Sequence, residues 1–453
     1  MSRFRAWFVS KPLFFTYHWL RRDGVLSAIR LLEESQWFDA PRLEALQHEK
    51  LYRLLQHSAR HVPYYRELFN SEGIGLEDFG KPEEFRKIPM LTKAMIRANR
   101  MALISEQATA HDLIPNSTGG STGEPLRFFN DRRAIAWQQA VVWRNQQWVG
   151  MYYSDREARL WGAMIDVNRA SMFRERMHGW LHQKLLLSAY DLSDESMASY
   201  AERLRKFKPR LLISYPGPLA TFCKFLEQRG IVIVGLQAVI MSAEQLHDWQ
   251  RELIERVLSA PVFDRYGCRE FGNIAHECSF HQGYHVNSER FLVEILDENC
   301  RPVGVGQTGG VFITDLDNYA FPFIRYAMGD RAVRSDRICS CGRGLPLIAH
   351  FEGRVMEVVE CPNGNRLGGT FFTIILRHSL PALLRFQVEQ LQRDLMVVRL
   401  VMPSDVIPSE EEAVLAAIRE KCGSEMKVRI EYVDEIPLTG SGKEKLVIAP
   451  QFE

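Results

Sequence analysis

Short apolar runs alternate with helical patterns through the middle of this 453-residue chain, and this alternation constrains its fold more than any other feature. The runs "RLLIS" (210–214) and "AVIMS" (238–242) are followed by "PLATFCKFLEQRG" and "AEQLHDWQRELIERVL", which have the apolar spacing of helices. Strands separated by helices in this way predict a mostly parallel sheet covered by helices. The fold class that we expect is therefore α/β.

The flanking regions have different textures. Residues 25–110 have the apolar periodicity of helices, whereas strands and turns dominate after residue 285, as in "RFLVEILDENCRPVGVGQTGGVFITDL". Beyond "EGR" (352–354), an alternating run "LMVVRLVM", a helix start "PSEEEAVLAAIREKC" and a strand "KVRIEYVDEI" indicate a small α+β unit. We expect a large domain over residues 1–352, with a helical N-terminal segment and a β-rich lobe, and a small domain over residues 353–453.

Charge and cysteine content exclude several classes of function. The 57 Lys and Arg against 56 Asp and Glu leave a formal charge of +1, which provides no field for nucleic acid. The apolar run "PLFFTYHWL" (12–20) is too short to span a bilayer and lacks a cleavage site, so we expect a cytoplasmic protein without a transmembrane segment. Aromatic and basic residues in 1–20 fit either a packed helix or a weak peripheral membrane contact. Eight cysteines in such a chain indicate thiols or metal ligands rather than disulfides.

The stretch "STGGSTGEP" (117–125) has two interpretations. It is a flexible turn, or it is a loop whose amides and hydroxyls surround a phosphate. It lacks the Gly-Lys-Ser/Thr ending of a Walker loop and the G-x-G-x-x-G spacing of a dinucleotide-binding fold. A phosphate site here therefore needs another design.

That design is indicated by motifs downstream. The loop is followed in order by "YGCREFG" (266–272), "YAMGD" (326–330), "EGR" (352–354) and "LTGSGKEK" (438–445), and the set resembles the adenylate-forming superfamily over nearly the whole chain. The runs "LLQHSARHVPYYRELF", "TDLDNYAFPFIRYAMGD" and "CSCGRGLPLI" look like the phenylacetate-CoA ligase branch, including its CapK-like relatives found with capsule and exopolysaccharide genes. The resemblance implies a large adenylate-forming domain of mixed sheets covered by helices, hinged to a small C-terminal lid domain.

The resemblance also implies an activity. Such AMP-forming acid-thiol ligases join a carboxylic acid to ATP as an acyl-adenylate with release of pyrophosphate, and then transfer the acyl group to coenzyme A. The capsule-associated relatives leave an amine or a sugar open as the acceptor. A non-catalytic nucleotide-binding scaffold is a further alternative, although the set of motifs is intact. The stretch 213–222 and the surroundings of Trp161 are expected to line the pocket for the acid.

Site residues follow from the matching motifs. The resemblance implies that Glu270 binds Mg²⁺ and that Tyr266 and Glu244 border the adenine. It also implies that Lys443 is the catalytic lysine of adenylation, with Lys445 as the fallback. Asp330 and Arg354 are expected at the ribose, and Met356 stands where the family usually has a hinge aspartate. The residues expected around the ATP phosphates are Ser117, Thr118, Gly119, Gly120, Ser121, Thr122 and Gly123.

Four further residues suit a metal. Three thiolates and an imidazole, from Cys278, His285, Cys339 and Cys341, would make a closed tetrahedral zinc site with a structural role, as in some members of the family branch. His281 or His276 could replace His285, and free buried cysteines are the alternative to a metal. The remaining cysteines show no partner spacing.

Overall fold

The chain forms two compact units in a computed structural model. The large unit comprises Met1–Met328 and Ala332–His350, and the small unit comprises Gly329–Arg331 and Phe351–Glu453. The structure describes residues 16–21, 23–75, 82–118, 126–152, 155–161, 183–189, 192–354, 358–363, 365–368, 371–372, 375–376, 379–380, 382–403, 411–437 and 445–449. Apart from Gly329–Arg331, the small unit begins at Phe351, beside the boundary that the sequence suggests between residues 352 and 353.

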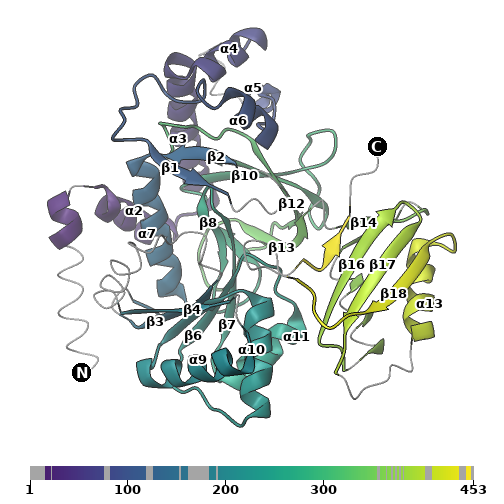
Figure 1. Cartoon of the computed structure of the whole chain (residues 1–453). Coiled ribbons are helices and arrows are strands. Elements are labelled where there is room, and N and C mark those ends of the chain that lie inside the picture. Colours follow the sequence, from purple (N-terminus) through teal and green to yellow (C-terminus); the bar gives the residue numbers. More distant parts are fainter. Residues whose placement is uncertain are drawn as a thin grey trace. The chain divides into compact units, whose positions relative to one another are not determined.

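An eleven-stranded sheet runs through the large unit (Figure 1), in the order β10-β11-β12-β13-β9-β8-β7-β6-β5-β3-β4. Five of its strands are mutually parallel: β4 (Lys184–Ser188), β3 (Glu157–Trp161), β5 (Leu211–Ser214), β6 (Ala238–Ser242) and β7 (Val262–Cys268). The others are β8 (Gly272–Glu277), β9 (Tyr284–Val286), β10 (Phe291–Leu296), β11 (Thr308–Asp315), β12 (Tyr326–Arg334) and β13 (Leu347–Arg354). The expected α/β class, with a β-rich part after residue 285, is confirmed.

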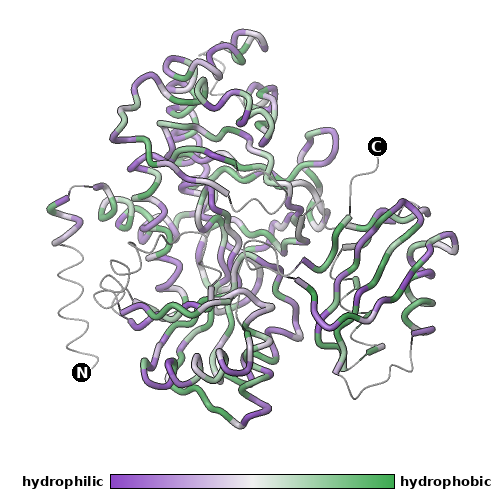
Figure 2. Tube along the Cα trace, viewed as in Figure 1, coloured by the Kyte–Doolittle hydropathy of each residue, from purple (hydrophilic) through white to green (hydrophobic). Residues whose placement is uncertain are grey.

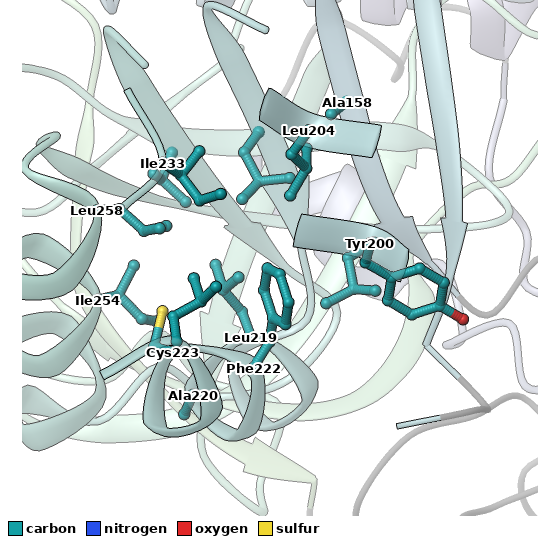
Figure 3. Packing of buried hydrophobic residues seen from close by; sticks show 14 of the residues in the cluster. Ala158, Tyr200, Leu204, Leu219, Ala220, Phe222, Cys223, Ile233, Ile254 and Leu258 are labelled. Atoms are coloured by element: carbon teal, nitrogen blue, oxygen red, sulfur yellow. The ribbon is translucent and has the colours of Figure 1, made fainter. Parts of the chain in front are cut away.

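Three helices pack on the parallel strands through one apolar core. They are α9 (Asp194–Phe207), α10 (Pro216–Gln228) and α11 (Asp248–Leu258). Figure 3 shows Leu204 of α9, Phe222 of α10 and Ile254 of α11 in the same buried cluster as Ala158 of β3, with Leu204 drawn nearest to Ala158. Helix α9 begins at Ser193, whose side chain accepts a hydrogen bond from the Ser196 amide and so caps the helix.

The N-terminal region is helical, as expected. It contains α2 (Val25–Ser35), α3 (Ala40–His61), α4 (Pro63–Ser71), α5 (Pro82–Lys87) and α6 (Lys93–Asn99). Hydrophobic and hydrophilic residues alternate along these helices in Figure 2. The hairpin of β1 (Ile114–Ser117) and β2 (Arg127–Asn130) follows, and then α7 (Arg132–Trp148), against which α2 packs.

The small unit has a sheet of its own. The order β18-β17-β16-β19 joins β18 (Lys427–Tyr432), β17 (Leu395–Val401), β16 (Arg385–Gln392) and β19 (Val447–Ile448). The hairpin of β14 (Val358–Glu360) and β15 (Arg366–Gly368) and the helix α13 (Glu411–Cys422) complete it. Its core is formed by residues such as Phe372, Val398 and Ile418. Among the described residues of the chain, no helix is both long and apolar enough to cross a membrane.

Candidate functional site

The carboxyl ends of four neighbouring parallel strands bring several expected site residues to one edge of the sheet. Trp161 ends β3, Tyr215 follows β5, and Glu244 lies two residues beyond β6. Tyr266 lies near the end of β7, and Glu270 lies two residues beyond it. In open α/β sheets, ligands bind outside this edge. The topology therefore gathers these residues from separate parts of the sequence to where a ligand would bind.

The connections after β5 and β6 are joined to each other. Glu244 Oε2 accepts a hydrogen bond of 3.2 Å from the Gly217 amide in the first turn of α10, where the positive end of the helix dipole favours a carboxylate. The rings of Trp161 and Tyr215 lie 4.2 Å apart, centre to centre. These contacts place the stretch expected to line the acid pocket beside Glu244.

The motif "YGCREFG" forms a hairpin turn between β7 and β8. We call residues 268–272 the carboxylate turn, after Glu270. Gly267 allows the two strands to approach, because a Cβ there would lie 2.3 Å from the carbonyl oxygen of Gly272. Gly272 itself has a φ of 73°, which favours glycine. The spacing of glycines in the motif is thus required by the backbone of the turn.

Glu270 is buried in the carboxylate turn. Its side chain is hydrogen-bonded by Tyr326, whose Oη donates to Oε1 at 3.0 Å. Cys268 also interacts with this carboxylate, and burial together with Glu270 raises the pKa of the thiol well above its usual range. Cys268 therefore stays a protonated thiol and is a poor nucleophile.

The described part of the predicted phosphate loop is anchored at the same turn. Thr118 closes the base of the loop, since its Oγ1 accepts from the Leu126 amide at 3.0 Å and its own amide donates to the Leu126 carbonyl at 3.0 Å. The preceding Asn116 donates from Nδ2 to the carbonyl oxygen of Arg269 at 3.2 Å. Ser117 and Thr118 thus lie next to the carboxylate turn, whereas residues 119–123 of the prediction lie outside the described residues.

The remaining expected nucleotide residues belong to the small unit. Asp330 lies half-buried in β12, directly after Gly329, whose φ is 78°. Arg354 is the last residue of β13, and β13 is the neighbour of β12 in the sheet. Lys443 and Met356 lie outside the described residues, and the backbone carbonyl of Lys445 accepts a hydrogen bond from Gln387 at 3.1 Å.

A second site lies at the opposite end of β8. Cys278 follows this strand, His285 lies in β9, and Cys339 and Cys341 lie in the loop before β13. The four ligand atoms lie within 4.8 Å of one another, and we call these residues the cysteine cluster. Cys278 Sγ lies 3.5 Å from Cys339 Sγ, and Cys341 Sγ lies 3.4 Å from His285 Nε2. Ligands about 2.3 Å from a central zinc at tetrahedral angles lie about 3.8 Å apart, so this spacing fits zinc.

The structure also distinguishes the three candidate histidines. His285 belongs to the cluster, whereas His281 Nδ1 lies 3.2 Å from Glu277 Oε2 and His276 Nδ1 lies 2.6 Å from the Glu277 carbonyl. Burial lowers the pKa of His285 to about 4, with the nearby Arg343 adding to the shift and the Leu345 backbone opposing it. The imidazole is therefore neutral near neutral pH, as metal ligation requires.

The thiols of the cluster differ in their surroundings. Burial raises the pKa of Cys278 to about 12 and also raises the pKa of Cys339. Burial acts in the same direction on Cys341, but hydrogen bonds from the backbone and side chain of Arg343 outweigh it and lower the pKa of this thiol. Arg343 therefore favours the thiolate at one position of the cluster.

The N-terminal segment covers the cluster's loop. Gln36 accepts hydrogen bonds at Oε1 from Trp148 Nε1 (2.8 Å) and Arg343 Nε (3.0 Å), and its carbonyl accepts from the Gly344 amide (3.0 Å). Only glycine fits at residue 344, because a Cβ there would lie 1.8 Å from the Phe38 carbonyl oxygen. The loop that carries two of the cysteines is thus held against residues 36–38.

Three contacts went unforeseen in the sequence. Asn116 and the phenol of Tyr326 both lie at the carboxylate turn, and the only signal for either is its place beside or within a quoted motif. Cys361 and Cys422, which show no partner spacing, contact each other through a side-chain hydrogen bond in the core of the small unit. They meet because β14 and α13 end side by side: Asn363 and Asn365, in the turn after β14, donate to the Lys421 carbonyl.

Known relatives resemble the chain in sequence. The family model described as the CapK C-terminal domain matches residues 360–450. A phenylacetate-coenzyme A ligase of Thermus thermophilus is 23% identical over 324 residues, which cover 70% of this chain and 72% of the relative. The protein CapK of Staphylococcus aureus is 22% identical over 417 residues, covering 89% of this chain and 88% of the relative.

Solved structures share its fold. A 2-hydroxyisobutyryl-CoA ligase, in the postadenylation state in complex with R3-HIB-AMP, matches with a TM-score of 0.73 at 18% identity and covers 92% of this chain and 91% of its own. An anthranilate CoA ligase in complex with anthranoyl-AMP matches with a TM-score of 0.56 at 16% identity, covering 75% of this chain and 66% of its own. The resemblance seen in the motifs is confirmed: the chain has the fold of adenylate-forming CoA ligases, is similar in sequence to phenylacetate-CoA ligases and to CapK, and matches the model of the CapK C-terminal domain over residues 360–450.

Proposed function

We propose that the protein activates a carboxylic acid with ATP as an acyl-adenylate, releases pyrophosphate, and transfers the acyl group to an acceptor, by default coenzyme A. The observation that carries the proposal is the hydrogen bond from Asn116 to the Arg269 carbonyl. It joins the Ser/Thr/Gly loop to the turn that bears Glu270, at the edge of the sheet where ligands bind. Two motifs that are distant in sequence thus meet where the phosphates and their cation would lie.

The proposal gives these groups separate tasks. Amides and hydroxyls of residues 117–123 surround the β- and γ-phosphates, and Glu270 holds the Mg²⁺ that shields their charge. Tyr266 and Glu244 border the adenine, Asp330 and Arg354 hold the ribose, and Lys443 neutralises charge as the acid carboxylate attacks the α-phosphorus. The fold of structural neighbours that hold acyl-AMP ligands supports this arrangement.

The acid would be bound beside the aromatic pair. Trp161 and Tyr215 lie at the carboxyl ends of adjacent strands, next to the connection that carries Glu244. Aromatic faces and apolar strand ends favour the organic part of an acid, while the carboxylate faces the nucleotide. We therefore propose the β3–β5 end of the edge as the site of the organic part of the acid.

The cysteine cluster would hold a structural zinc. Its four donors are the soft thiolates and imidazole that zinc prefers, and four protein ligands leave no position for substrate. Zinc there supplies a cross-link between β8, β9 and the loop before β13. Its contribution is therefore to stability and not to the chemical step.

The test of the proposed function is acid-dependent exchange of labelled pyrophosphate into ATP. With Mg²⁺ and a panel of aromatic and aliphatic acids, we expect label to enter ATP with at least one acid and not in the acid-free control. Formation of ADP and phosphate contradicts adenylation. ATP binding without exchange for any acid favours the scaffold alternative.

The acceptor is tested on the acid that supports exchange. Coenzyme A, amines and sugars are added in turn, and the acylated product is identified by mass spectrometry. An acyl-CoA product is expected by default. An amide or an acyl sugar formed in its place assigns the protein to the other class of acceptor.

A further inference from the structure

The phenol of Tyr326 binds the carboxylate expected to hold Mg²⁺. We propose that Tyr326 is a positioning residue, which orients Glu270 so that the carboxylate can receive the Mg²⁺ that arrives with ATP. This inference rests on the proposed function of Glu270. It adds a residue to the site whose role the motif comparison left unassigned.

The contact itself has the geometry of an orienting interaction. Tyr326 Oη donates to Glu270 Oε1 at 3.0 Å, and the two side chains belong to β12 and to the turn after β7. Tyr326 is 0% exposed and Glu270 is 5% exposed, so water competes little for this hydrogen bond. A donor on one carboxylate oxygen fixes the rotation of the carboxylate and hence the direction of the other oxygen. Such outer-shell donors commonly set the orientation of metal ligands.

Aromatic packing fixes the ring of Tyr326. The rings of Phe271 and Phe323 lie 5.8 Å and 5.3 Å away, both at a steep interplanar angle of 76°. Edge-to-face contacts of this kind favour one orientation of the ring. Phe271 directly follows Glu270 in the chain, so the cluster that fixes the phenol also fixes the carboxylate turn.

The backbone before Tyr326 is held just as firmly. Arg325 has a φ of 51°, a conformation that costs free energy unless its surroundings impose it. Its guanidinium is hydrogen-bonded to both oxygens of Glu294 and to the carbonyls of Arg86 and Ile88. Leu91 binds the Arg325 carbonyl and the Ala327 amide at 3.0 Å and 2.9 Å, on either side of Tyr326. The start of β12 therefore has little freedom to move the phenol away from Glu270.

Packing alone does not account for the hydroxyl group. Tyr65, another buried tyrosine of this region, uses its hydroxyl for the backbone: it donates to the Pro322 carbonyl at 3.1 Å and accepts from the Ile324 amide at 3.2 Å. Tyr326 instead donates to a carboxylate. The pair offers a matched control, because Tyr65→Phe and Tyr326→Phe each remove one buried phenol hydroxyl from neighbouring packing.

The experiment measures how much Mg²⁺ improves ATP binding. The ratio of the ATP dissociation constant in EDTA to that in Mg²⁺ is determined by calorimetry for the wild type, Tyr326→Phe, Glu270→Gln, the double variant and Tyr65→Phe, with melting temperatures recorded alongside. We expect Glu270→Gln to abolish most of the improvement. Tyr326→Phe should reduce it by about three- to tenfold, as the loss of one hydrogen bond of ordinary net strength implies. Tyr65→Phe should keep the wild-type ratio.

The double variant separates orientation from general destabilisation. If Tyr326 acts through Glu270, adding Tyr326→Phe to Glu270→Gln should change the ratio no further. If Tyr326→Phe keeps the wild-type ratio while Glu270→Gln loses the improvement by Mg²⁺, the inference is overturned and the proposed function is left intact. A wild-type ratio in Glu270→Gln overturns the role of Glu270 itself. A further loss in the double variant contradicts action through the carboxylate.

Discussion

The two ends of strand β8 carry polar groups in different arrangements: a single carboxylate at one end and four converging metal-ligand atoms at the other. At its start, the carboxylate turn presents one carboxylate, which is bound by a tyrosine from another strand. At its end, the four ligand atoms of the cysteine cluster face one another within 4.8 Å. The cluster is the one group among the described residues whose donors could together hold a metal ion. A single carboxylate is too little to retain Mg²⁺, which usually binds to one or two carboxylates together with substrate phosphates. Under the proposed function, the cysteine cluster therefore suits a resident ion, whereas the carboxylate turn suits an ion that arrives and leaves with the nucleotide.

The largest expected effect is the loss of pyrophosphate exchange in a variant that leaves the cysteine cluster unchanged. Lys443→Ala should lower acid-dependent pyrophosphate exchange by about a hundredfold or more, because an ammonium group that neutralises charge in the transition state is lost. The ATP dissociation constant and the melting temperature should remain near those of the wild type. Exchange assays and calorimetry measure the two quantities separately.

The control for this variant is Lys445→Ala, the neighbouring lysine on the same segment. It should retain exchange, and Asp330→Ala should instead weaken ATP binding. Equal loss of exchange in both lysine variants would move the catalytic role away from Lys443 alone.

The next largest effect is the loss of zinc and of thermal stability in a variant that keeps pyrophosphate exchange. Purified protein should carry about one zinc per chain, and Cys339→Ser combined with Cys341→Ser should abolish this zinc and lower the melting temperature by several degrees. Below that melting temperature, pyrophosphate exchange should stay within about twofold of the wild type, because a closed site has no position for substrate. Metal analysis, calorimetry and the exchange assay measure these three outcomes.

The matched control for the double serine variant is Cys300→Ser, an exposed cysteine outside the cluster. It should keep both zinc and stability. Zinc-free protein as stable as the wild type would contradict the structural role.

The smallest effect is a dependence on pH confined to the cluster's surroundings. Burial lowers the pKa values of His276 and His285 to about 4, below the value of about 6.5 expected in the unfolded chain. Between these values the unfolded state binds protons that the folded state does not. The free energy of unfolding of zinc-stripped protein should therefore fall as the pH decreases from about 6.5 to about 4, by up to about 3 kcal/mol for each histidine.

Tryptophan fluorescence during urea unfolding can follow this change, because Trp148 lies 6.2 Å from the His276 ring and 5.4 Å from the His285 ring. A zinc-stripped protein whose stability is constant over this range would show that neither buried imidazole resists protonation.

Local patterns were sufficient to predict much of the fold. The runs at 210–214 and 238–242 became β5 and β6 because parallel strands are apolar on both faces, and the intervening periodicity became α10. The order of the strands in the sheet could not be predicted from the sequence. β13 lies between β12 and β9, and such a neighbourhood is set by contacts between distant segments rather than by the pattern within one.

The candidate sites also contain residues that the sequence could indicate and contacts that it could not. The resemblance of the motifs indicated Glu270, and the residue types indicated Cys278, Cys339 and Cys341 with His285, for which His281 or His276 remained an alternative. Neither could indicate that Asn116 binds the backbone 153 residues away or that Tyr326 binds a carboxylate 56 residues away. Asparagine and tyrosine have many uses, and only the folded chain determines which partner each one meets.

The contacts of Gln36 limit how far the chain can be shortened. A version that starts at residue 40 keeps every described strand, yet it lacks Gln36. The side-chain oxygen that accepts hydrogen bonds from Trp148 and Arg343 is then missing, as is the backbone carbonyl that accepts from the Gly344 amide. The loop with Cys339 and Cys341 would then be left open to solvent and to proteases on the side that residues 36–38 cover. Anyone trimming the aromatic N-terminus for expression should therefore cut before this residue, even though no motif of the nucleotide site lies there.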